Sequence, residues 1–109
     1  MPKISLTRLR QEVPELSYQS SDVFKYSSST KTVHFIKEHL EYDQGVWMLL
    51  HEIGHFIADH SDFKLDIELL KIETEAWREA LKLAKKFEIE IQDDFIEDCL
   101  DEYRDWQFK

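Results

Sequence analysis

Apolar side chains recur at every third or fourth position over most of the second half of the chain, which is the spacing of one helix face. This period predicts helices over about residues 43–60, 67–86 and 92–106. The last of these helices carries an apolar stripe formed by Phe95, Ile96, Cys99, Leu100, Tyr103 and Trp106. The chain beyond residue 43 is therefore expected to be mainly helical.

The N-terminal part of the chain mixes one short helix with strand patterns. Leu6–Val13 has helical spacing, Ser5 can cap its start, and Pro14 cannot continue it. Apolar and aromatic residues support a strand that ends near Tyr26, and β-branched and aromatic residues predict a second strand over Lys31–Lys37. Because a serine-rich turn separates these two strands, they are expected to form an antiparallel hairpin.

Three short segments complete the expected pattern. Residues 38–42 are mostly polar and predict a loop, and Ser61–Asp66 is expected to link the first two long helices. Ile89 and Ile91 alternate with acidic residues, which is typical of a short extended piece. The predicted fold is a small α+β domain over residues 1–109, with a hairpin or small sheet packed against several helices.

Composition supports one folded unit. With 109 residues, of which 42% are hydrophobic, the chain can bury one modest core. No apolar run approaches the ~18 residues of a membrane span, and the first residues lack a signal-peptide pattern, so no membrane association is expected. The lone Cys99 cannot form an intrachain disulfide and has apolar neighbours at helical spacing. A core cysteine and a cytoplasmic location are therefore expected.

Acidic residues dominate the C-terminal part of the chain. The net charge is −9, and residues 88–109 carry nine acidic against two basic side chains, which gives −7 of that total. Because phosphate binding depends on cationic groups, direct binding to nucleic acid is not expected. A charged, solvated helix face is the default explanation, and a basic protein partner is the alternative.

The clearest chemical pattern is His51-Glu52-Ile53-Gly54-His55, a match to the H-E-x-x-H zinc motif. Residues four apart lie on one helix face, so His51 and His55 can bind one Zn²⁺, and Glu52 can reach a water molecule beside it. The apolar residues of this helix fall on the opposite side. A glycine within a helix costs about 1 kcal/mol relative to alanine, so Gly54 beside the proposed metal face suggests that something approaches closely there.

A third zinc ligand is expected from the next helix. Glu73 falls near the middle of its apolar face, where a carboxylate is costly unless it is paired or bound to a metal. Glu75 points about 150° away from that face and is expected to be solvated, and Glu79 lies at its edge. Glu73 is therefore the predicted ligand, and a salt bridge to a Lys or Arg is the alternative role.

These residues resemble the ImmA/IrrE family of zinc metallopeptidases, which joins an H-E-[LI]-G-H helix to a later E-x-x-A-[ND]-x-F-A helix. The match runs over about residues 23–87 and includes Thr32–Ile36, which looks like the strand beside the active site. The resemblance implies a zincin-like fold and makes Glu73 the third ligand. Trp77 stands where the family has Asn or Asp, and Glu79 stands where it has Phe.

The resemblance implies hydrolysis of peptide bonds in a protein or peptide substrate, such as a transcriptional repressor in mobile-element relatives. Zinc held by His51, His55 and Glu73 would activate water, and Glu52 would act as the general base. Three residues are candidates for stabilising the oxyanion: His34, Tyr42 and Tyr103. The alternative is a non-catalytic, zinc-containing module that binds proteins. Glu52 distinguishes the two, because a scaffold needs no general base.

Overall fold

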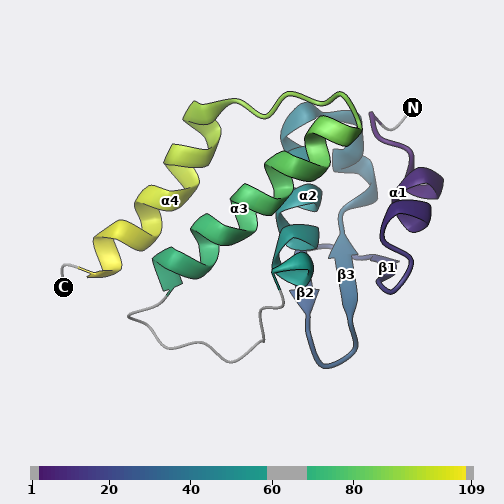
Figure 1. Cartoon of the computed structure of the whole chain (residues 1–109), viewed down its shortest axis with the longest axis horizontal. Coiled ribbons are helices and arrows are strands. Elements are labelled where there is room, and N and C mark those ends of the chain that lie inside the picture. Colours follow the sequence, from purple (N-terminus) through teal and green to yellow (C-terminus); the bar gives the residue numbers. More distant parts are fainter. Residues whose placement is uncertain (1–2, 59–68, 108–109) are drawn as a thin grey trace.

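Three short strands form a mixed sheet in the computed structural model, which describes residues 3–58 and 69–107 (Figure 1). The strands are β1 (Ser17–Ser20), β2 (Lys25–Ser27) and β3 (Thr32–Phe35), in the order β1-β3-β2. β2 and β3 are antiparallel with Tyr26 opposite Val33, which confirms the predicted hairpin. β1 was not predicted, because its sequence Ser-Tyr-Gln-Ser lacks an apolar strand pattern, yet it pairs in parallel with β3.

The four described α-helices agree with the predicted ones in position. They are α1 (Leu6–Glu12), α2 (Asp43–Ile57), α3 (Leu69–Lys86) and α4 (Asp93–Gln107). The Ser5 side chain accepts a hydrogen bond from the backbone N–H of Arg8, so it caps α1 as expected. The expected link over Ser61–Asp66 and the side chains of Tyr103 and Trp106 lie outside the described part of the structure.

One local prediction was wrong. The expected loop at residues 38–42 is a 3-10 helix, η1 (Lys37–Glu41), whose Leu40 is buried. Residues 89–92, where a short extended piece was predicted, form neither a helix nor a strand. Just before them, Glu88 has a positive φ of 57°, and the Ile89 N–H bonds back to the carbonyl of Ala84, which closes the end of α3.

α2 is the central helix of the domain. It packs against β2 and β3 on one side and along α3 on the other, and α4 lies on the far side of α3 (Figure 1). α1 lies beside the sheet and reaches the C-terminal end of α3, where the Arg8 guanidinium is 4.2 Å from the centre of the Phe87 ring. This arrangement buries α2 on several sides, including the side that carries the two histidines.

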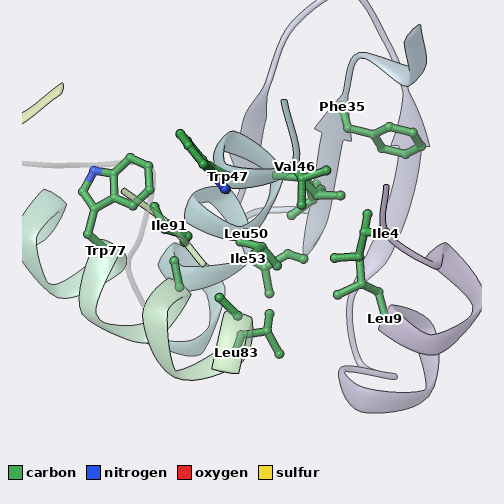
Figure 2. Packing of buried hydrophobic residues seen from close by; sticks show 14 of the residues in the cluster. Ile4, Leu9, Phe35, Val46, Trp47, Leu50, Ile53, Trp77, Leu83 and Ile91 are labelled. Atoms are coloured by element: carbon green, nitrogen blue, oxygen red, sulfur yellow. The ribbon is translucent and has the colours of Figure 1, made fainter. Parts of the chain in front are cut away.

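The core joins both halves of the chain. α2 contributes Leu49, Leu50 and Ile53, which are fully buried, and α3 contributes a run of small and large apolar residues, Ala80, Leu83 and Ala84. Figure 2 shows the two tryptophans Trp47 and Trp77 at one end of the cluster, and Ile4, Leu9 and Phe35 at the other. Within the described residues, no helix is long and apolar enough to cross a membrane. Cys99 packs against this core, as expected.

Candidate metal centre

α2 presents His51 and His55 from successive turns of one helix face. Their rings are 4.7 Å apart between centroids, and both side chains are buried, with 6% and 4% of each residue exposed. Ligand atoms of His51, Glu52 and His55 all lie within 4.8 Å of one another. Two buried imidazoles and a carboxylate so close together are unusual for a purely structural helix face, because buried polar groups need partners.

α3 brings Glu73 to the same point. Its Oε2 atom lies 2.7 Å from Nε2 of His51 and 3.3 Å from Nε2 of His55, and the residue is 4% exposed. The helical phase therefore correctly predicted a buried Glu73, and its carboxylate contacts the two histidines. The described contacts bring together all three predicted zinc ligands.

Gly54 allows this approach of α3 to α2. A Cβ atom at Gly54 would overlap with the carbonyl oxygen of Ala76, so only glycine fits without a shift of one helix. Ala76 follows Glu73 by three residues on α3 and is fully buried. The close approach that the glycine suggested from sequence is confirmed, and it places the Glu73 carboxylate within reach of both imidazoles.

The three groups change each other's pKa. For Glu73, burial alone would raise the pKa, but hydrogen bonds and charge from His51 and His55 outweigh it and hold the pKa well below its usual range. Burial also pushes the pKa of His51 down, but the carboxylates of Glu52 and Glu73 raise it from 6.5 to about 8. Burial lowers the pKa of His55. Glu73 is thus ionised at neutral pH, and a proton and a metal ion compete for His51.

The second carboxylate of the cluster, Glu52, is held by the sheet. Its Oε1 atom accepts a hydrogen bond from the backbone N–H of Tyr26 in β2 at 2.8 Å, and its Oε2 atom lies 3.3 Å from Nδ1 of His51. Only 12% of the Glu52 side chain is exposed. The hairpin therefore fixes the orientation of the carboxylate beside the histidines, a contact that sequence patterns do not signal because its donor is a backbone group.

This donor set fits zinc. Two imidazole nitrogens and one carboxylate oxygen are the ligands of many catalytic zinc sites, with bonds of about 2.0–2.2 Å. Ligands around such a tetrahedral ion lie roughly 3.3 Å apart. The separation of Glu73 Oε2 from His55 Nε2 equals that value, and its 2.7 Å separation from His51 Nε2 needs only a small outward movement.

The other sequence candidates lie elsewhere or outside the described side chains. Tyr42 is 65% exposed, precedes the first turn of α2 and packs its ring against His39. His34 lies between Val33 and Phe35, which are buried in the core with α2, so it points to the opposite face of the sheet. The side chain of Tyr103 is not described. Glu75 is half-buried on α3 beside Lys71 and Arg78.

One neighbour of the centre was not predicted. The indole ring of Trp77 on α3 stacks on the His51 imidazole, with centroids 4.3 Å apart and planes inclined by 11°. Its position four residues after Glu73 places both side chains on the same helix face, and that spacing was the available signal.

Comparisons of the chain with protein-family models, with curated proteins and with solved structures found no match. The chemistry of this centre therefore has to be inferred from its own residues and their geometry.

Proposed function

We propose that the protein is a zinc-dependent metallopeptidase of the ImmA/IrrE type, with a zincin-like fold, that hydrolyses peptide bonds of a protein substrate. The observation that carries the proposal is that His51, His55 and Glu73 come together from two helices. Oε2 of Glu73 lies 2.7 Å from Nε2 of His51 and 3.3 Å from Nε2 of His55. The H-E-x-x-H spacing and the position of Glu52 support it. A transcriptional repressor is the first substrate class to try.

Each residue of the site has its own role in the proposed hydrolysis. His51, His55 and Glu73 would hold Zn²⁺, which when bound lowers the pKa of water and polarises a carbonyl group. Glu52 accepts the proton of the attacking water and then delivers it to the leaving amine nitrogen. One of its oxygens lies within 4.8 Å of a nitrogen on each histidine, a gap that one water molecule spans. The Tyr26 N–H keeps this carboxylate in place.

The Glu52→Gln variant tests the proposal. Glutamine keeps the shape of the side chain and an oxygen acceptor for the Tyr26 N–H, but it lacks a basic carboxylate. Zinc content and fold should stay as in the wild type, while turnover should fall by roughly 10²–10⁴-fold, the usual contribution of a positioned general base. Cleavage is measured on repressor-type proteins and on basic partners captured by the variant itself.

Glu79→Gln is the matched control, because Glu79 lies on α3 in an ion pair with Lys82, away from the histidines. This variant should cleave at the wild-type rate. Cleavage by Glu52→Gln at the wild-type rate would remove Glu52 from the mechanism. Tight partner binding without cleavage by either protein would favour the non-catalytic interaction module.

A further inference from the structure

Trp77 is in direct contact with one of the proposed zinc ligands. Its indole ring and the His51 imidazole lie nearly parallel, with centroids 4.3 Å apart and an interplanar angle of 11°. Trp77 is 2% exposed and His51 is 6% exposed, so the stack is shielded from water. A flat contact of this kind limits rotation of the imidazole about its bond to Cβ.

The contact that usually fixes a metal-binding histidine is a long one in His51. Such a ring normally donates its second N–H to a carboxylate, a carbonyl or water, which sets its orientation. Among the described residues, Nδ1 of His51 is buried and has no hydrogen-bond partner. The Glu52 carboxylate is 3.3 Å away, but it is not in hydrogen-bonding geometry. The ring is held by the 2.7 Å contact of its Nε2 with Glu73 and by this long contact of Nδ1, so packing has to contribute to its orientation.

A side chain of α4 packs against Trp77. The ring of Phe95 meets Trp77 edge-on, with centroids 5.8 Å apart and planes at 84°, and it also meets Trp47 at 5.0 Å. The Trp77 Nε1 atom is buried and makes no hydrogen bond within the described part of the chain. Trp77 thus acts through the shape and flatness of its ring and not through a polar contact.

We infer that Trp77 is a positioning residue, which holds the His51 imidazole by stacking so that Nε2 faces Glu73 and the site binds zinc more tightly. The inference rests on the proposed function, since it concerns the affinity of that same site. It assigns a role to one of the positions at which this chain differs from the resembling family. It also connects α4 to the metal centre through Phe95.

Three variants test the inference by zinc affinity, measured in competition with a chromophoric chelator. Trp77→Leu removes the stack and should weaken zinc binding by about 10-fold or more, the usual effect of removing a partner that orients a metal ligand. Trp77→Phe keeps a flat ring and should bind within about threefold of the wild type. Phe35→Leu is the matched control. It removes a buried aromatic ring at the end of the apolar cluster opposite Trp77 (Figure 2), so it should leave zinc affinity unchanged.

A second measurement uses the wild-type protein, so it does not depend on whether a variant folds. Ring protons of an imidazole above an indole face are shifted upfield in the NMR spectrum, so those of wild-type His51 should resonate upfield of those of His55. The comparison is made with zinc bound, because without zinc the raised pKa of His51 keeps that ring protonated near neutral pH and moves its protons downfield. The upfield shift should persist in Trp77→Phe.

Unshifted His51 protons would overturn the inference, as would equal losses of zinc affinity in Phe35→Leu and Trp77→Leu. Zinc binding by the wild type, together with unchanged affinity in Trp77→Leu, would overturn this inference alone and leave the proposed function standing. A wild-type protein that binds no zinc would overturn both.

Discussion

The contact between α2 and α3 has two parts with opposite chemistry. In one part, Leu50, Ile53 and Leu83 are almost completely buried among other apolar side chains. In the other part, His51, His55 and Glu73 are buried to nearly the same extent but are polar and ionisable. Burial of apolar groups stabilises a fold by itself, whereas buried charges must be paired or bound to a metal. The same two helices thus provide stability in one part and a reactive site in the other.

This difference between the two parts explains how the polar groups can be held in place without stabilising the fold themselves. Replacing a buried ion pair by apolar residues often leaves stability unchanged or increases it. The His51–Glu73 pair, with its 2.7 Å contact, is therefore weak evidence for a structural role. The apolar part of the interface, together with Gly54, supplies the binding energy and the close approach that hold three polar groups at one point.

The largest effect on stability is expected from the apolar part. Leu50 is fully buried, so Leu50→Ala should lower the free energy of unfolding by about 2–5 kcal/mol. Urea denaturation measures this loss. Zinc affinity of the folded variant should remain that of the wild type, because Leu50 contacts the core and not the histidines. A variant with normal stability and weakened zinc binding would contradict the division between the two parts.

Removal of zinc should take away only the stability that metal binding at the polar part of the contact provides. Zinc that binds only the folded state adds about 4 kcal/mol to the free energy of unfolding when its free concentration is 1,000 times Kd. Chelation should therefore lower the melting temperature of the wild type, and by a similar decrement that of Leu50→Ala. The Glu73→Ala variant should respond little. An unchanged wild-type melting curve, with metal removal verified, would show that no ion connects α2 and α3.

Two glycines of α2 give a finer test. A Cβ atom at Gly54 would overlap with the Ala76 carbonyl of α3, and one at Gly45 would overlap with the His39 carbonyl of η1. Each change to alanine should cost about 1–3 kcal/mol in stability through overpacking. Only Gly54→Ala should also weaken zinc binding, because it pushes Glu73 away from the histidines. Equal zinc affinity in the two variants would contradict this role of Gly54.

Sequence periodicity was sufficient for the helices and for much of the site. The 3.6-residue period located α2, α3 and α4, and the phase of α3 identified Glu73 as buried although Glu75 lies only two residues away. Local patterns succeed here because each helix has one strongly apolar face.

Other features depend on contacts between distant residues and could not be predicted. β1 is polar and exists through parallel pairing with β3, which no local pattern signals. The hydrogen bond from the Tyr26 N–H to Glu52 involves a backbone donor 26 residues away. The stacking of Trp77 on His51 depends on how closely α2 and α3 approach, which the Gly54–Ala76 contact determines.

The most direct test of the central claim is a metal count on protein purified without added zinc or chelator. The wild type should contain about one zinc ion per chain, as three converging ligands predict. Glu73→Ala should lose most of this zinc, whereas Glu75→Ala, which changes the same residue type two positions away, should keep it. A wild-type protein without metal, or a loss of zinc in Glu75→Ala but not in Glu73→Ala, would contradict the assignment of the site.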